Sequence, residues 1–376
     1  MFENLSHLSL QQYWWVIISL LASFLVFLMF VQGGQTLIYT LGKTTLEKTM
    51  LVNAIGRKWE FTFTTLVTFG GAFFASFPLF YATSFGGAYW VWMAILFCFI
   101  IQAIAYEFRS KPDNFLGRKT YDVFLFINGA LGTILIGTAV GTFYNGAMFS
   151  VNEMNSSQWE TSVRGLEAVL EWHNVALGLT VFFLSRILGI LYFIRNINDE
   201  NIQRRSRKQL LYNTIPFLVF FLAFLIRLLI KDGFAYEPET YEVSLERYKY
   251  LHNLINMPLV LILLLAGVIL VVYGLYRGLF TDNITGFYFS GSGTVLVVFS
   301  LFLIAGLNQT CYYPSLFDLQ SSLHIENSSS SRYTLTVMSY VSLLVPFVLA
   351  YIIYAWSSVN KKRIDADEIK NESHVY

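Results

Sequence analysis

The chain has 376 residues, of which 55% are apolar and only 13% are charged. Soluble domains usually carry about 25% charged residues, so this composition excludes an ordinary water-soluble protein. The net charge of +1 gives no sign of a nucleic-acid partner. The arrangement of apolar residues along the chain is therefore the first guide to the fold.

Nine apolar stretches follow one another, most of them about 17 to 24 residues long. A hydrocarbon core about 30 Å thick needs roughly 20 helical residues, so each stretch is predicted to cross a membrane as a helix. The sixth is short and the eighth begins in a polar Gly-Ser stretch. The predicted spans are Tyr13–Thr36, Thr62–Tyr81, Tyr89–Ala105, Tyr121–Tyr144, Val175–Phe193, Ile215–Ile230, Met257–Leu275, Phe287–Leu307 and Leu335–Trp356.

Lysines and arginines are distributed unevenly between the two sides that the alternating loops define. One side carries 18 of them and the other five, while Arg186 and Arg227 fall inside spans. Loops rich in Lys and Arg normally stay in the cytoplasm. We therefore expect the N-terminus outside and the C-terminus, with the tail 357–376, in the cytoplasm.

The long connection between the fourth and fifth spans suggests a coarse repeat of four spans, four spans and one. The predicted units are 13–144, 175–307 and the ninth span at 335–356. The two cysteines, Cys98 and Cys311, are too few for a disulfide framework and are expected to be unpaired.

Side chains that could hold a redox centre are scarce. The histidines lie in loops or at span ends, never as a pair on one helix face; they are His7, His173, His252, His324 and His374. The chain has no Cys-x-x-Cys motif and neither of the glycine-rich phosphate-binding motifs. We therefore assign no catalytic residue, no metal site and no haem ligand to this chain. Its expected role is to support a reaction housed elsewhere.

Ionisable residues in or near the spans are the remaining candidates. An arginine at the bilayer centre costs about 2.5–3.5 kcal/mol, so Arg186 should face protein or water, either on a substrate or proton path or in a buried pair. Glu60 begins the second span and Glu107 ends the third, on the same side. Either carboxylate could admit protons from the cytoplasm, because a partly dry site raises the pKa of a carboxyl group. The alternative for Glu60 is a favourable charge at a helix N-terminus.

Several short motifs, in order along nearly the whole chain, resemble subunit II of the cytochrome bd quinol oxidases. The resemblance is strongest before and within the last span. The matching segments are Trp14-Trp15, 59–78 with its Gly70-Gly71-Ala72-Phe73-Phe74-Ala75 run, Glu107-Phe108-Arg109-Ser110-Lys111, Phe287-Tyr288-Phe289-Ser290, 330–338 and Leu344-Val345-Pro346.

This resemblance implies an all-α integral membrane protein whose nine transmembrane helices form two four-helix bundles plus one additional helix. It implies a haem-free chain in a bacterial inner membrane, paired with a larger subunit I that holds two b-type haems and one haem d. That complex oxidises quinol and reduces O2 to water. Small single-helix accessory subunits, surrounding lipid and a structural quinone are further partners that the resemblance allows.

The resemblance also implies a proton route from the cytoplasm. In relatives an aspartate follows the tryptophan that opens the second helix, and Trp59-Glu60 matches this pair with Glu in place of Asp. Two departures bear on the route: Val31-Gln32-Gly33-Gly34-Gln35-Thr36, which has no carboxylate, lies where the family has an acidic motif, and Gln102 corresponds to a common arginine. Glu60 and then Glu107 are the proton-path candidates. Structural or charge-pairing roles are expected for the side chains of Trp59, Arg109, Lys111 and Arg186.

Two other functions remain open from the sequence. A secondary transporter also uses intramembrane ionisable residues, and Gly33-Gly34 and Gly70-Gly71 could interrupt its helices. They do not fall at matching positions of two inverted halves, which favours the oxidase subunit. A membrane scaffold with no transport or catalytic part is the third hypothesis.

Overall fold

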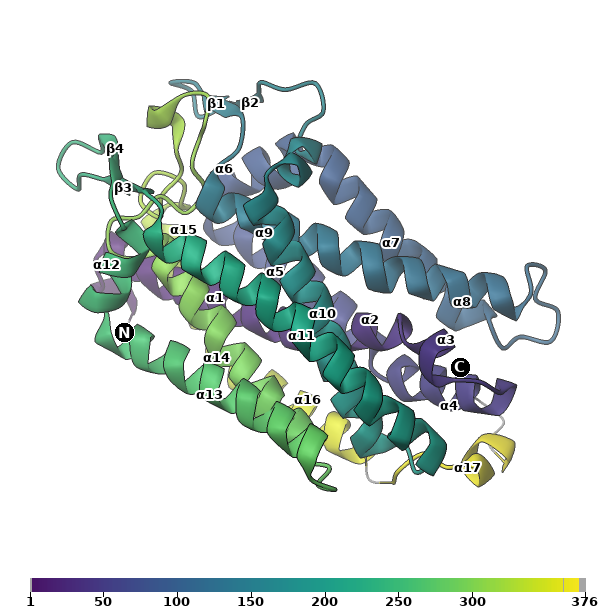
Figure 1. Ribbon diagram of the computed structural model, residues 1–376. Coiled ribbons are helices and arrows are strands. Elements are labelled where there is room, and N and C mark those ends of the chain that lie inside the picture. Colours follow the sequence, from purple (N-terminus) through teal and green to yellow (C-terminus); the bar gives the residue numbers. More distant parts are fainter. Residues whose placement is uncertain (1, 361, 372–376) are drawn as a thin grey trace.

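Long helices running side by side dominate the architecture (Figure 1). The computed structural model describes residues 2–360 and 362–371, so Lys361 and residues 372–376 of the predicted tail, including His374, lie outside the described residues. We call one end of the helices the β end, because it carries two short hairpins. The other is the basic end, which carries Lys43, Arg57, Arg109 and Arg205.

Within residues 2–360 and 362–371, seven helical segments are long and apolar enough to cross a membrane, or up to nine if each of two bent pairs is one span. The all-helical membrane class predicted from the sequence is therefore confirmed, and the number of spans depends on these bent pairs. Helices of these spans and bent pairs include α1 (His7–Leu28), α5 (Trp59–Ser76), α7 (Tyr89–Phe108), α10 (Trp172–Asn196), α11 (Glu200–Ile230), α13 (Pro258–Phe280), α14 (Gly286–Gly306), α15 (Arg332–Ser342) and α16 (Val345–Val359).

The other helical elements join and extend these helices. They are η1 (Phe2–Asn4), α2 (Phe30–Gln35), α3 (Ile38–Leu41), α4 (Thr45–Gly56), α6 (Pro78–Phe80), η2 (Tyr81–Gly87), α8 (Arg118–Ile127), η3 (Asn128–Gly132), α9 (Thr133–Asn145), η4 (Leu166–Leu170), α12 (Lys249–Asn256), η5 (Leu319–Ser321) and α17 (Ala366–Asn371). The fourth predicted span consists of α8, the π-helical turn η3 and α9, which form one continuous helical segment, Arg118–Asn145.

Two predicted boundaries were wrong for identifiable reasons. Helix α11 begins at Glu200 rather than Ile215, because the Asp199 side chain caps it by accepting from the Ile202 N–H at 2.8 Å. Its first turns are polar and invisible to a hydropathy argument. The second predicted span is interrupted at Pro78, with a bend of 119° between Thr45–Ser76 and Pro78–Gly87. Proline cannot continue the hydrogen-bond ladder of a helix, which explains the break.

Small residues let several helix backbones approach closely, as is typical within membranes. A Cβ atom added to Gly267 of α13 would lie 2.9 Å from the Gly293 carbonyl oxygen of α14. The crossing of α2 over α10 is tighter still, because a Cβ added to Gly33 would lie 2.0 Å from the Ser185 carbonyl. These two crossings depend on glycine.

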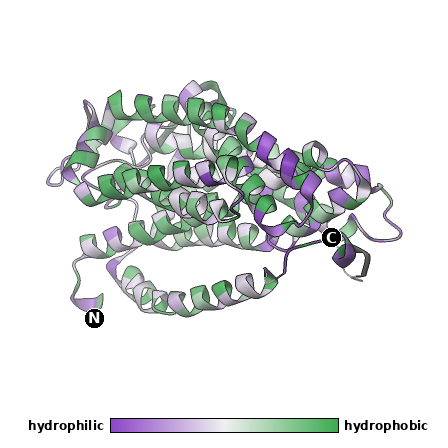
Figure 2. Cartoon of the chain, turned by 60° about the horizontal axis from the view of Figure 1, so that its bottom comes forward, coloured by the Kyte–Doolittle hydropathy of each residue, from purple (hydrophilic) through white to green (hydrophobic). Residues whose placement is uncertain are grey.

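The last long helix packs differently from the others. Helices α15 and α16 bend by 41°, and α16 has no buried residue among those described. Figure 2 shows this pair as an arc that bows away from the body of the protein before the C-terminal segment. At its basic end α16 returns to the bundle, where the Trp356 ring contacts Phe27, Phe30 and Phe61.

The β end is built from two hairpins and one long loop. Strands β1 (Phe149–Val151) and β2 (Ser157–Trp159) pair antiparallel, with Phe149 opposite Trp159. Strands β3 (Gly233–Tyr236) and β4 (Val243–Glu246) pair with Gly233 opposite Glu246. The loop 307–331 bridges to the residues just before β1, through Ala147–Ser315, and to β3, through Ala235–Thr310. Segments distant in sequence thus form one layer over the helix ends.

A buried histidine in this layer predicts acid sensitivity. The ring of His324 is stacked on Tyr236 at 3.8 Å, and burial lowers the pKa of His324 from 6.5 to about 3. The unfolded chain therefore binds more protons between these two pH values. The free energy of unfolding is therefore undiminished above pH 6.5. It decreases as the pH falls toward 3, by up to about 1.4 kcal/mol per pH unit.

We expect the thermal transition of the purified protein to fall as the pH is lowered from 6.5 toward 4. A His324→Phe variant keeps an aromatic ring on Tyr236 but cannot titrate, so its transition should depend less on pH in this range. Equal acid sensitivity in the two proteins would contradict the assignment to His324.

Candidate functional site

Trp59 and Glu60 lie at the start of α5, at the basic end. Glu60 is exposed in the first turn of the helix, and the Trp59 ring is half-buried and stacked on Tyr106 of α7 at 5.6 Å. Beyond Glu60, the exposed residues of α5 include Val67 and Phe74, 58% and 61% exposed, together with Thr64 and Thr68. Glu60 is thus a carboxylate at the head of a largely uncharged helix face.

The other charged residues predicted near the third helix separate into two pairs. Glu107 and Lys111 form an exposed ion pair of 3.3 Å, with side chains 65% and 58% exposed. Arg109 points the other way: its Nε lies 2.7 Å from Oδ1 of Asp122, and both side chains are buried. Sequence reasoning missed Asp122, although a carboxylate inside the fourth predicted span was a signal.

Arg186 lies in the middle of α10 and joins three helices. Its Nε donates to Asn213 Oδ1 of α11 at 2.6 Å, and Nη1 donates to Thr36 Oγ1, just after α2, at 2.7 Å. These neutral acceptors hold the guanidinium group between packed helices. The geometry favours the helix-joining role over a substrate or proton path.

Four buried amide side chains lie between α2, α7 and η3, toward the basic end. We call Gln32, Gln35, Gln102 and Asn128 the amide cluster. Gln102 Oε1 accepts from Gln32 Nε2 at 2.8 Å and from Gln35 Nε2 at 3.0 Å. Gln102 of α7 is therefore in contact with both glutamines of α2, and the three side chains meet as neutral amides.

A buried lysine, Lys58, lies two residues before Glu60 in the sequence. The Lys58 side chain is fully buried, and its Nζ lies 4.4 Å from the centre of the Trp356 ring. Because a cation over an indole face is attracted by the ring quadrupole, this contact fixes the end of α16 against the start of α5.

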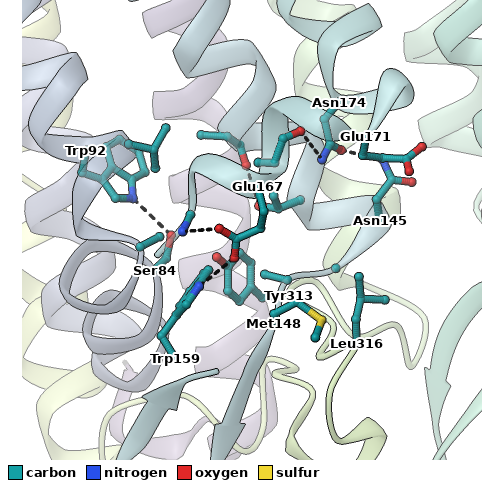
Figure 3. A pocket seen from close by; sticks show the side chains of 18 of the residues that line it. Ser84, Trp92, Asn145, Met148, Trp159, Glu167, Glu171, Asn174, Tyr313 and Leu316 are labelled. Atoms are coloured by element: carbon teal, nitrogen blue, oxygen red, sulfur yellow. Dashed lines mark hydrogen bonds between the residues drawn. The ribbon is translucent and has the colours of Figure 1, made fainter. Parts of the chain in front are cut away.

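A pocket lined by several polar side chains lies at the β end, between α7, α9, α10 and the loop 307–331 (Figure 3). Its volume is about 320 Å³. The Glu167 carboxylate accepts from Trp159 Nε1 at 2.7 Å and from the Gly165 N–H at 2.8 Å. Figure 3 shows these bonds converging on Glu167. Its acidic side chain is thus used to order the loop.

The basic wall of this pocket is also used internally. Lys231 Nζ donates to the Tyr144 carbonyl at 2.6 Å and to Asn145 Oδ1 at 2.7 Å. Burial, and secondarily the charge of Arg227, lowers the pKa of Lys231 to about 8. The charged groups of this pocket are therefore used to connect helix ends and loops to one another, and the pocket is not arranged as an open catalytic site.

Three of the histidines, His7, His173 and His252, use ring nitrogens in contacts within the chain. Both ring nitrogens of His173 are engaged, at 3.0 Å from Asn145 Oδ1 and 3.0 Å from the Phe224 carbonyl. His7 contacts the Ser330 carbonyl, and His252 contacts Glu246. Within residues 2–360 and 362–371, no group of three or more His, Cys, Asp or Glu side chains could hold a metal ion.

Comparison with known proteins identifies the family to which the sequence is similar. The sequence model of the cytochrome bd terminal oxidase subunit II family matches residues 10–359. The chain is 29% identical to a probable cytochrome oxidase subunit 2 of Haemophilus influenzae, over 96% of this chain and 97% of that one. It is 26% identical to cytochrome bd-I ubiquinol oxidase subunit 2 of Escherichia coli K12, with the same coverage.

The fold is also similar to a solved structure. A chain of the bd oxidase from Geobacillus thermodenitrificans superposes with a TM-score of 0.60 at 15% identity, covering 94% of this chain and 99% of that one. This likeness concerns the fold alone, while the sequence match extends over nearly the whole chain. The chain therefore belongs to the cytochrome bd terminal oxidase subunit II family.

Proposed function

We propose that this chain is the haem-free subunit of a bd-type terminal oxidase that couples quinol oxidation to the reduction of O2 to water. In this proposal subunit I carries the two b-type haems and the haem d, and this chain stabilises it. The match of the family over residues 10–359 is the single observation that carries the proposal. The engagement of both ring nitrogens of His173 within this chain supports placing the haems on the partner.

The basic end is assigned to the cytoplasm in this proposal. Lysines and arginines concentrate in the loops that meet there, and such loops normally remain on the cytoplasmic side of a membrane. The β end would then lie outside, together with the N-terminus. The chain is a multi-pass membrane protein in either orientation.

The apolar faces of α5 and α16 support a stabilising contact with subunit I. Residues of α16 are exposed along its length, including Phe347 at 74% and Tyr351 at 70%. The helix contacts its own bundle mainly through Trp356. A large partner seated against α5 and α16 would hold this arc in place, and lipid would cover the remaining apolar surface.

Glu60 is the proposed proton-uptake group. It lies at the basic end and is exposed on the α5 face, so that a proton accepted from the cytoplasm could pass to a partner on that face. A carboxylate in a partly dry contact binds and releases protons more readily near neutral pH than one in water. Glu107 is the second candidate, but its exposed pair with Lys111 keeps it on the surface of this chain.

Replacing Glu60 by Gln tests this role. We expect the Glu60→Gln complex to assemble with full haem content but to turn over about tenfold or more slowly, because a positioned proton-transfer group contributes about 10²–10⁴-fold. Glu60→Asp should be nearly silent, since it keeps the carboxylate. Quinol-dependent O2 consumption and generation of membrane potential are the measurements.

Asp282→Asn is the matched control, because Asp282 is another exposed carboxylate at the basic end but lies on the loop between α13 and α14. Unchanged turnover and membrane potential in Glu60→Gln would exclude this residue from the route.

Purification of the intact complex tests the whole proposal against the transporter and scaffold hypotheses. An oxidase subunit should co-purify with a larger chain whose haem d absorbs red light, and the complex should consume O2 with quinol. A colourless assembly that moves a solute would establish a transporter instead.

A further inference from the structure

The amide cluster contains more hydrogen-bonding groups than its members can satisfy for one another. All four side chains are at most 1% exposed. Five of their polar atoms have no hydrogen-bond partner within the described part of the chain. They are Gln32 Oε1, Gln35 Oε1, Gln102 Nε2, Asn128 Nδ2 and Asn128 Oδ1.

Reversing the amides does not remove this deficit. Turning all three glutamine amides over lets Gln102 Nε2 donate to two carbonyl oxygens, but leaves the nitrogens of Gln32 and Gln35 in the unpaired positions. Asn128 is unpaired at both atoms in either orientation. Buried polar groups in native proteins are almost always paired. Five unpaired atoms in one place therefore indicate a bound partner.

The mixture of groups identifies the class of that partner. Three of the unpaired atoms are acceptors and two are amide nitrogens that donate. A cation would use only the acceptors and an anion only the donors. Water donates and accepts, and a buried water typically makes about three hydrogen bonds.

Backbone geometry places the cluster members together. Asn128 opens η3, a π-helical turn, and such turns occur frequently at functional sites. A Cβ added to the next residue, Gly129, would lie 2.3 Å from the Gln32 carbonyl oxygen and 3.2 Å from Gln35 Cβ. The turn that carries Asn128 is thus pressed against the helix that carries both glutamines.

One contact extends from the cluster toward the basic end. Gln35 Nε2 donates to the Tyr106 hydroxyl at 3.1 Å, and the Tyr106 ring is stacked on Trp59, the neighbour of Glu60. The cluster is therefore connected through Tyr106 to Trp59, the residue that precedes the candidate proton-uptake residue.

We propose that Gln32, Gln35, Gln102 and Asn128 bind a cluster of internal water molecules in the basic half of the protein, behind Tyr106 and Trp59. Use of this water as a proton reservoir for Glu60 rests on the function proposed above, whereas the binding of water does not.

The test uses the intact purified complex. A density map at a resolution that shows other internal waters should contain peaks at about 2.7–3.2 Å from the Asn128 side chain, and Asn128→Leu should lose them. The thermal transition of Asn128→Leu should fall by about 2–4 °C, because a satisfied network is broken. Ser206→Ala is the control: this buried hydroxyl is also unpaired but lies far along the sequence on α11, and its removal should leave the transition unchanged or higher.

Absence of density at Asn128, or a higher transition for Asn128→Leu, would show that the amides are dry and would overturn the inference. The Glu60→Gln complex should keep the water peaks. If its turnover is normal while the peaks remain, the proton route fails and the water site stands.

Discussion

The Asp122→Ala variant is expected to be about 3–5 kcal/mol less stable than the parent chain, because it removes the Asp122 carboxylate from a buried ion pair with Arg109. The two side chains are 2% and 5% exposed and 2.7 Å apart, so neither has ready access to water. A loss of this size is a large fraction of the stability of most folded domains. The yield of assembled complex and its thermal transition measure the effect.

The neighbouring exposed pair supplies the control for the Asp122 experiment. Glu107→Gln removes one partner of an ion pair at the same end of α7, but its side chains are more than half exposed. Such pairs contribute about 0–1 kcal/mol, so this variant should assemble normally. A double variant, Arg109→Met with Asp122→Leu, removes both charges and should recover much of the lost stability. Normal stability of Asp122→Ala alone would show that the pair is not structurally important.

Substitution of Gly33 is expected to have the second large effect. The Cβ of Gly33→Ala would lie 2.0 Å from the Ser185 backbone carbonyl, and a backbone atom cannot rotate out of the way. Helices α2 and α10 would have to separate, at a cost above the about 1–3 kcal/mol typical of overpacking. We expect little or no assembled complex, measured by co-purification of the two subunits.

Gly70→Ala is the matched control for the helix crossing. Gly70 is a buried glycine in α5, but its nearest atom would be the Phe85 ring at 3.6 Å, an ordinary contact. Alanine also favours the helix by up to about 1 kcal/mol, so this variant should assemble at least as well as the parent. Equal behaviour of the two variants would refute the close crossing of α2 and α10.

Hydropathy succeeded where the physics is local. The run of apolar residues at Tyr89–Ala105 must satisfy its backbone within the segment, and α7 occupies Tyr89–Phe108 accordingly. The eighth stretch, Phe287–Leu307, agrees with α14 within one residue at each end. The hydropathy argument failed for the polar first half of α11, Glu200–Thr214, because no apolar signal marks those turns.

Contacts between charged and polar residues were less accessible from the sequence. Arg109 has Glu107 two residues away in the chain, but neighbours at that spacing point to different sides of a helix, and the arginine pairs with Asp122. The segment 31–36, which contains Gln32, and Gln102 were recognised only as departures from an acidic motif and an arginine of the family. Their contact at 2.8 Å depends on how α2 packs against α7.

The sequence by itself determined the membrane class, the family and the scarcity of cofactor ligands, because these follow from composition, segment length and short motifs. Tertiary structure decided which polar groups meet, since partners such as Arg186 and Thr36 are far apart in the chain and joined only by helix packing. It also decided which glycines are indispensable, because Gly33 and Gly70 differ in their neighbours across a helix crossing and not in their chemistry.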